Sequence, residues 1–287
     1  MVWRIRAREM DVSRALVMGI LNVTPDSFSD GGRFRASDAA AARAERMVAE
    51  GADLIDIGGE STRPGAAPVA EAEECARVVP AVRAVAALGV PVSVDTAKAS
   101  VAEAALEAGA AVINDVTALG DPGMGRVVAA SGAGLVLMHM LGTPRSMQKD
   151  PNYDDVAVEV AAFLNERRDR AEDLGVGRDR IVLDPGIGFG KTLRHNLELL
   201  ARLEVLTALG SPVLVGASRK RFLGTLTGVE AAERRLSGSL AAAVAARLGG
   251  AVVFRVHDVG PTREALAVIE GILDAREPKA SKSSGGG

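Results

Sequence analysis

Eight short apolar segments recur along this 287-residue chain, and each is followed by a longer, alanine-rich amphipathic segment. The short segments consist mainly of Val, Ile and Leu, as expected for strands buried on both faces of a parallel sheet. The predicted strands span residues 15–21, 54–57, 92–95, 112–115, 134–139, 181–184, 213–216 and 252–256. The predicted helices span residues 37–50, 70–88, 98–108, 122–131, 156–174, 192–203, 234–248 and 262–275. Glycines suited to a left-handed C-cap follow seven of these helices, at positions 51, 89, 109, 132, 175, 210 and 249.

Strands that alternate with helices in this way predict an α/β fold, a (β/α)8 TIM barrel, with an open doubly wound sheet as the alternative. No linker or change in composition divides the chain, so residues 1–278 are predicted to form one domain. Residues 2–8 are expected to add a short extra strand or hairpin ahead of the barrel. The small, polar residues 279–287 are predicted to be disordered.

Charge and composition argue against several classes of partner. The formal net charge of −3 does not favour nucleic acid or an anionic membrane surface. No apolar run is long enough to span a bilayer, and the first residues lack the apolar core of a signal peptide. The single cysteine, Cys75, permits no internal disulfide, which suits a reducing compartment. We therefore expect a cytoplasmic protein without nucleic-acid or membrane partners.

Polar residues gather at the carboxyl ends of the predicted strands, whereas the opposite ends carry plain turns. In a barrel the active site lies at the carboxyl ends of the strands. A barrel with a purely structural role has no reason for this asymmetry. The polar residues at these ends are Asn22, Glu60, Ser61, Thr62, Arg63, Asp95, Thr96, Asn114, Asp115, His139, Asp184, Ser218, Arg219, Lys220, Arg255, His257 and Asp258.

Two carboxylates, an amide and an ammonium group come from four different strand ends, at Asp95, Asn114, Asp184 and Lys220. Such a set suits a flat heterocycle, because a carboxylate accepts two hydrogen bonds from an amino-pyrimidinone edge and an amide both donates and accepts. The alternative is that each aspartate only caps a following helix. Convergence of four groups favours a ligand site.

A second set, Asn22, Arg63, Arg255 and His257, suits an anion, since barrels often bind phosphate near the loops after the last two strands. The alternative for Arg255 and His257 is a salt bridge beside a structural histidine. The three histidines of the chain show no zinc-binding spacing. A Mg2+ ion carried by a substrate pyrophosphate needs few protein ligands, and Asn22 is the expected one.

The glycine-rich segment 184–191, DPGIGFGK, matches neither the Walker A motif nor the dinucleotide fingerprint. We interpret it as a loop whose backbone approaches a ligand, with Phe189 as an aromatic wall. His195, in the helix that follows, is expected to lie at the surface or cap that helix.

Residues 19–32, GILNVTPDSFSDGG, run from an apolar strand into a polar loop that is longer than most connections. Together with six other motifs, which occur in the same order as in that family, this segment makes the chain resemble the dihydropteroate synthases of folate biosynthesis. The motifs are GILNVTPDSFSDG (19–31), DIGGESTRPG (56–65), VDT (94–96), INDV (113–116), DPGIGF (184–189), GASRKRF (216–222) and RVHD (255–258).

The resemblance implies that 6-hydroxymethyl-7,8-dihydropterin pyrophosphate and para-aminobenzoate are converted into 7,8-dihydropteroate and pyrophosphate. The implied pterin-binding residues are Asp95, Asn114, Asp184, Lys220 and Arg255. The implied pyrophosphate-binding residues are Asn22, which also binds Mg2+, Thr62, Arg63, Arg255 and His257. The implied aminobenzoate pocket contains Phe28, Thr62, Pro64, Phe189, Ser218 and Lys220. The implied catalytic residues are Asp26, Asp95, Asp184, Lys220 and Arg255.

We expect a largely dissociative displacement, with loop 22–32 closing over the pyrophosphate.

Two other functions share parts of the pattern: a pterin-dependent corrinoid methyltransferase, and a paralogue that binds pterin without turnover. The arginine-bearing motifs favour the synthase over the methyltransferase, which has no pyrophosphate to hold. The resemblance also implies a homodimer, with the helix face 240–247 as a candidate interface or, alternatively, as core.

Overall fold

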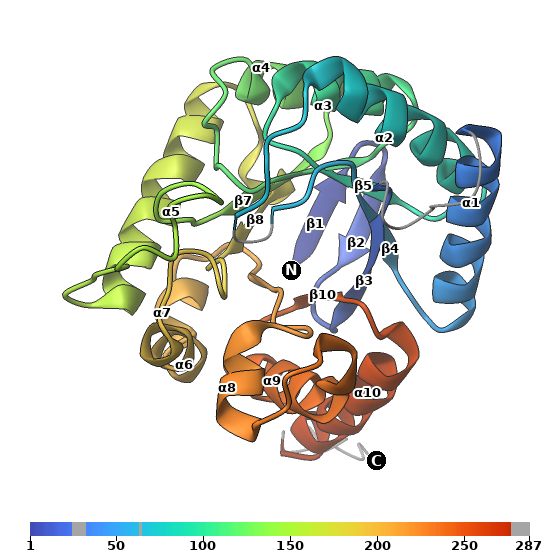
Figure 1. Ribbon diagram of the computed structural model, residues 1–287. Coiled ribbons are helices and arrows are strands. Elements are labelled where there is room, and N and C mark those ends of the chain that lie inside the picture. The colour runs from blue at the N-terminus through green and yellow to red at the C-terminus, as the bar shows by residue number, and fades with distance from the viewer. Residues whose placement is uncertain (25–32, 63–64, 277–287) are drawn as a thin grey trace, which may run out of the picture.

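Eight parallel strands form a closed barrel with the helices around it in the computed structural model, which describes residues 1–24, 33–62 and 65–276 (Figure 1). The strands are β3 (Leu16–Asn22), β4 (Leu54–Gly58), β5 (Val92–Asp95), β6 (Val112–Asp115), β7 (Gly134–Met138), β8 (Ile181–Asp184), β9 (Leu214–Val215) and β10 (Val253–Val256). Their order is β8-β7-β6-β5-β4-β3-β10-β9. A parallel bridge between Leu183 and Val213 joins β8 to the chain entering β9. This closure confirms the predicted barrel over the open sheet.

The outer layer consists of helices that follow the strands in turn. They are α1 (Arg33–Ala49), α2 (Glu71–Ala86), α3 (Ala99–Glu107), α4 (Met124–Ser131), α5 (Val156–Asp173), α6 (Leu193–Ala201), α7 (Glu204–Thr207), α8 (Arg221–Thr227), α9 (Leu236–Leu248) and α10 (Val259–Arg276). No helix in these described ranges is long and apolar enough to cross a membrane. Residues 279–287, which were predicted to be disordered, lie outside the described part of the chain.

Some local features of the helices differ from the predictions. The first helix begins at Arg33, so Ser37 lies within it and does not start it. The left-handed residue after α9 is Gly250, with φ of 93°, whereas Gly249 has φ of −78°. The seven-residue helix α8 was not predicted, because it is too short to establish a helical period.

Apolar side chains form two buried clusters, one on each face of the sheet. The larger cluster lies between the strands and the helices. The smaller one fills the barrel interior and contains Met18, Leu54, Val112, Val136, Val182, Leu214 and Val253, together with Trp3 and Ile5. Each strand is therefore covered on both faces, which explains why the strand sequences are apolar throughout.

An antiparallel hairpin, β1 (Val2–Ile5) with β2 (Arg8–Asp11), precedes the barrel as expected, and in Figure 1 it lies across the ring of strands. Trp3 is fully buried, and its Nε1 donates a hydrogen bond of 2.9 Å to the Arg180 carbonyl oxygen. Gly134, the first residue of β7, leaves room for it: a Cβ there would lie 2.6 Å from Ile5 Cγ2. The hairpin thus seals the end where the strands begin, and leaves the carboxyl end open.

Replacing Trp3 by Ala should lower the free energy of unfolding by about 3–5 kcal/mol, because it removes a large buried side chain and leaves a cavity. Urea denaturation followed by circular dichroism measures the change. Val2→Ala, on the same strand but 41% exposed, is the matched control and should change stability by no more than about 0.5 kcal/mol. Equal losses in the two variants would contradict the sealing role.

Candidate active site

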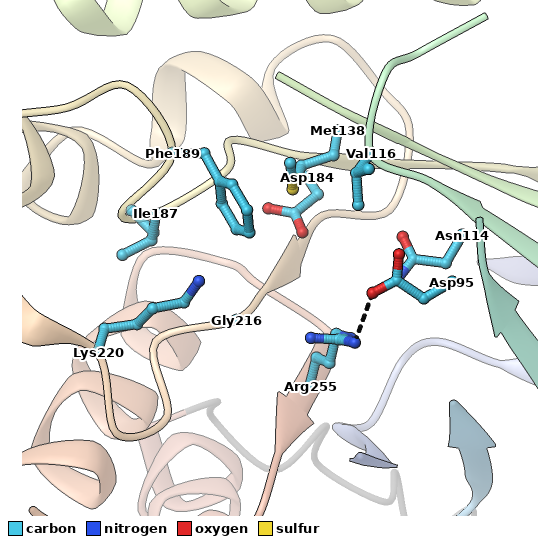
Figure 2. Close-up of a pocket in the computed structure, with 10 residues that line it drawn as sticks. All are labelled: Asp95, Asn114, Val116, Met138, Asp184, Ile187, Phe189, Gly216, Lys220 and Arg255. Atoms are coloured by element: carbon cyan, nitrogen blue, oxygen red, sulfur yellow. Dashed lines mark hydrogen bonds and ion pairs between the residues drawn. The ribbon is translucent and has the colours of Figure 1, made fainter. Parts of the chain in front are cut away.

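One pocket opens at the carboxyl end of the barrel, and five charged or amide side chains converge on it (Figure 2). They are Asp95 at the end of β5, Asn114 on β6, Asp184 at the end of β8, Lys220 just before α8 and Arg255 on β10. The remaining wall is apolar or glycine, from Val116, Met138, Ile187, Phe189 and Gly216. The structure thus brings together all five residues predicted to bind the flat ring.

Arg255 forms the centre of a buried ion-pair network. Its Nε donates to Asp56 Oδ2 at 2.6 Å, and one terminal nitrogen donates to Asp95 Oδ2 at 2.8 Å. Asn114 Nδ2 also donates to Asp56 Oδ2, at 3.2 Å. Asp56 has no exposed surface, and it was not predicted as a site residue. A charged residue in the middle of the apolar segment LIDIG was the available signal, because a buried charge requires a partner.

The two pocket carboxylates are harder to ionise than ordinary aspartates. Burial raises the pKa of Asp95 to about 7, against the opposing effect of Arg255, while the Asp56 charge raises the pKa further. Burial also raises the pKa of Asp184 to about 6, and the Gly186 N–H opposes that increase. Both carboxylates therefore take up a proton more readily than an exposed aspartate, and the cations beside them oppose that protonation.

The backbone after β8 orients Asp184. The N–H of Gly186 donates to Asp184 Oδ1 at 2.7 Å. Gly186 has φ of +67°, and a Cβ there would lie 1.9 Å from the His139 carbonyl oxygen. Only glycine fits this turn, so the DPG sequence is a geometric requirement for presenting the carboxylate.

An aromatic ring and a cation form the wall between β8 and β9. The Lys220 Nζ lies 4.0 Å from the centre of the Phe189 ring, a cation–π contact that Figure 2 shows at the pocket edge. Before Lys220, Arg219 adopts a left-handed φ of 59°, and its N–H donates to Ser239 Oγ at 2.9 Å. The Arg219 guanidinium pairs with Asp258, with 3.0 Å between Nε and Oδ2. This strained turn fixes where Lys220 leaves the barrel rim.

Behind the pocket, Lys191 is buried and donates to Phe189 O at 3.0 Å. Its Nζ also lies 2.9 Å from His139 Nδ1. Burial lowers the pKa of Lys191 to about 7 and that of His139 to about 3, so this histidine is neutral. Both side chains support the glycine-rich loop and are not among the pocket-lining residues. His195 forms a capping box with Thr192 at the start of α6, which is one of the two roles expected for it.

Comparison with known proteins decides the family. The profile of the pterin binding enzymes matches residues 18–257. The dihydropteroate synthase of Escherichia coli K12 is 49% identical over 271 residues, which cover 94% of this chain and 96% of that protein. The chain belongs to the dihydropteroate synthase family of pterin-binding enzymes. The predictions of the family, of the barrel and of a transferase of folate synthesis are confirmed.

Solved structures of the family superimpose closely on this barrel. A Yersinia pestis dihydropteroate synthase in complex with a sulfonamide drug has a TM-score of 0.90 at 48% identity, covering 96% of this chain and 100% of that one. A Xanthomonas albilineans dihydropteroate synthase with 4-aminobenzoic acid also has a TM-score of 0.90 at 48% identity, covering 96% and 99%. A second structure of the Xanthomonas enzyme contains 7,8-dihydropteroate, with a TM-score of 0.86, 45% identity and coverage of 97% and 100%.

In this member of the dihydropteroate synthase family, Ser218 and His257 contact each other at the edge of the site. The Ser218 Oγ lies 3.1 Å from His257 Nδ1 and accepts a 3.2 Å bond from the His257 N–H. Burial, and after it the charge of Arg219, lowers the pKa of His257 to about 4. His257 is therefore neutral at pH 7, so it offers an anion a hydrogen bond and no positive charge. Ser218 is not among the residues that line the pocket, and its place in the aminobenzoate site stays a prediction.

The metal prediction depends on Asn22, the last residue of β3. Asn22 and Asp95 both lie beside Gly58. A Cβ placed at Gly58 would be 3.6 Å from Asn22 Oδ1 and 3.8 Å from Asp95 Cβ. Within the described residues, no three His, Cys, Asp or Glu side chains come together as a metal site. An amide oxygen suits Mg2+, but a single neutral oxygen suffices only if substrate phosphates supply further ligands. The donor set thus fits a metal that arrives with a pyrophosphate.

Several predicted residues lie outside the described part of the chain. These are Asp26 and Phe28 in the first loop, and Arg63 and Pro64 after β4. Their roles, and closure of loop 22–32, stay predictions. Thr62 is described as half-buried, next to the second of these gaps.

Gly186→Ala should destabilise the protein by more than about 2 kcal/mol, because the new Cβ would overlap the His139 carbonyl oxygen. Gly210→Ala is the control, since Gly210 also has a positive φ, of +76°, but no atom within 4 Å of a Cβ. It should cost only about 1 kcal/mol, from backbone strain alone. Thermal unfolding compares the two, and equal losses would show that the contact with His139 is unimportant.

Proposed function

We propose that this pocket binds 6-hydroxymethyl-7,8-dihydropterin pyrophosphate and transfers its pterin methylene group to the amino nitrogen of para-aminobenzoate. The products would be 7,8-dihydropteroate and pyrophosphate. The observation that carries the proposal is the convergence of Asp95, Asn114, Asp184 and Lys220 on one pocket. The Xanthomonas albilineans relative, solved with 4-aminobenzoic acid and with 7,8-dihydropteroate, supports the same substrate and product here.

The pterin ring suits this set of side chains. The ionised Asp184 can accept two hydrogen bonds from the amino-pyrimidinone edge, as carboxylates do from paired N–H groups. Lys220 donates to the ring carbonyl or a ring nitrogen. The Arg255 guanidinium, held in its plane by two carboxylates, can lie along a ring face. Each of these interactions uses a group that the barrel already orients before the ligand binds.

The bond between the pterin methylene carbon and the pyrophosphate oxygen breaks first, and its electron pair leaves with pyrophosphate. Positive charge then spreads from the methylene carbon into the electron-rich dihydropterin, where the anions of Asp95 and Asp184 stabilise it. The neutral arylamine nitrogen attacks that carbon to form the new C–N bond, and the proton that the nitrogen then loses passes to solvent water. Asn22, Thr62, Arg63 and His257 would hold the leaving group. Mg2+, bound by Asn22 and the phosphates, would supply charge neutralisation of that group.

The second substrate would lie against the wall formed by Phe189 and Lys220, next to Thr62. Phe189 offers an aromatic face, and the Lys220 ammonium lies over that face. Phe28 and Pro64 are expected to complete this pocket. A sulfonamide resembles para-aminobenzoate in shape and charge, so it should compete for the same wall.

We also propose that the enzyme is a cytoplasmic homodimer. The candidate face 240–247 is partly packed inside the chain, since Ala242, Ala243 and Ala246 are at most 8% exposed while Ala241 and Ala245 are exposed. Exposed apolar side chains near it offer a better interface, with Val268 at 65% and Ile272 at 47% one turn apart on α10. The single cysteine in the sequence supports a reducing compartment.

Activity is tested by mixing the purified protein with the pterin pyrophosphate, Mg2+ and para-aminobenzoate. We expect pyrophosphate release together with formation of 7,8-dihydropteroate, both dependent on Mg2+. Pterin binding without release would identify a paralogue that binds without turnover. No binding would contradict the proposed function.

Asp184→Asn should weaken binding of the pterin pyrophosphate by about 100-fold, because two charge-assisted hydrogen bonds are weakened together. Isothermal titration calorimetry measures the dissociation constant. Asp155→Asn, which weakens an aspartate–arginine pair with Arg202 outside the pocket, is the control and should change affinity much less. Near-wild-type affinity of Asp184→Asn would refute its role.

Activity should fall in acid, because the pKa values of Asp95 and Asp184 are raised to about 7 and about 6. Both must be anions to stabilise positive charge, so kcat/KM should rise with pH across the region of about 6 to 7, where these groups lose their protons in the free enzyme. Steady-state kinetics at saturating Mg2+ provide the profile. A profile that is flat across this region would show that neither carboxylate needs to ionise.

A further inference from the structure

We propose that Asp56 is a positioning residue for the pterin site: it holds Arg255 and Asn114 in the orientations in which they meet the ligand. This inference rests on the proposed function, since it concerns how the same pocket recognises the pterin ring. Asp56 itself is not among the pocket-lining residues. It acts through the two residues that are.

Three strands meet at the Asp56 carboxylate. Asp56 lies on β4, paired in register with Ile20 of β3, and its side chain is fully buried. Its Oδ2 accepts from Arg255 Nε of β10 at 2.6 Å and from Asn114 Nδ2 of β6 at 3.2 Å. One oxygen atom thus ties two sides of the barrel together below the ligand. Asp56 Oδ1 is buried without a hydrogen-bond partner among the described residues.

The contact with Asp56 determines which atom Asn114 offers to a ligand. An ionised carboxylate only accepts hydrogen bonds, so the Asn114 amide must turn its NH2 group toward Asp56. The Asn114 Oδ1 is buried, lacks a partner among the described residues and belongs to a pocket-lining side chain. Asn114 therefore presents an acceptor, and the ligand edge that meets it must donate.

The contact with Asp56 also orients Arg255. Nε bonded to Asp56 and a terminal nitrogen bonded to Asp95 fix the guanidinium plane at two points (Figure 2 shows the second). Without Asp56, the guanidinium would keep one anchor and could rotate about it. The guanidinium plane would then no longer be held parallel to a bound flat ring. Ligand binding would have to fix its orientation, which costs binding free energy.

The test measures binding of 6-hydroxymethyl-7,8-dihydropterin pyrophosphate by calorimetry, without para-aminobenzoate, to the wild type, Asp56→Ala and Asp56→Asn. Asp56→Ala removes the shared acceptor, so the dissociation constant should rise about tenfold or more. Asp56→Asn keeps one oxygen that can accept both bonds, so it should recover a large part of the loss. This rescue separates hydrogen-bond positioning from a general effect of substitution.

Asp53→Ala is the matched control. Like Asp56, Asp53 pairs with an arginine, Arg263. It also accepts a 2.7 Å hydrogen bond from the Val17 N–H, but it precedes the first residue of β4, away from the pocket. It should lower the melting temperature yet leave pterin affinity unchanged. If Asp56→Ala does not fold, Asp56→Ser, whose shorter hydroxyl cannot reach both donors, takes its place.

Equal pterin affinity in the wild type and a folded Asp56→Ala or Asp56→Ser variant would overturn the inference alone. An equal loss of affinity in Asp53→Ala would also overturn it, because the effect would then follow stability. A wild-type chain that does not bind the pterin pyrophosphate would overturn the proposed function and the inference with it.

Discussion

The pocket depends on one buried cation held between two carboxylates. Ionised groups far from water are costly, and Arg255 is tolerated because Asp56 and Asp95 each accept one of its N–H groups. The same contacts keep both carboxylates from being isolated buried anions. Asp56, Asp95 and Arg255 come from β4, β5 and β10, which lie in one run of neighbouring strands, β5-β4-β3-β10, so the network depends on this strand order. Fold and charge balance therefore support each other at this point.

This arrangement gives the two pocket aspartates different environments. Asp95 faces a cation but also the nearby charge of Asp56, whereas Asp184 is held by a backbone N–H. Burial is the main cause that raises the pKa of both, to about 7 for Asp95 and about 6 for Asp184. A site prepared in this way stabilises positive charge without large rearrangement of its own dipoles during the reaction.

Much of the fold and site could be predicted because the apolar strand segments recur regularly along the sequence and polar residues follow them. Strands buried on both faces read as apolar runs, and the polar residue that ends each run marks the barrel face where function lies. Asp95, Asn114, Asp184, Lys220 and Arg255 were found in this way. Asp56 was not, because it lies inside a strand and acts on other side chains. The short helix α8 and the contact between Ser218 and His257 were also missed, because both depend on tertiary packing that no local pattern records.

The hairpin that seals the barrel has a consequence for how this protein can be observed. Trp3 is the one tryptophan of the chain, and it is fully buried where the strands begin, at the opposite end from the pocket. Its indole emission therefore reports the integrity of the sealed end, and an aromatic ligand at the other end does not touch it. A single sample can thus report loss of the fold through the protein's own emission, while occupancy of the site is followed separately through the ligand's absorption.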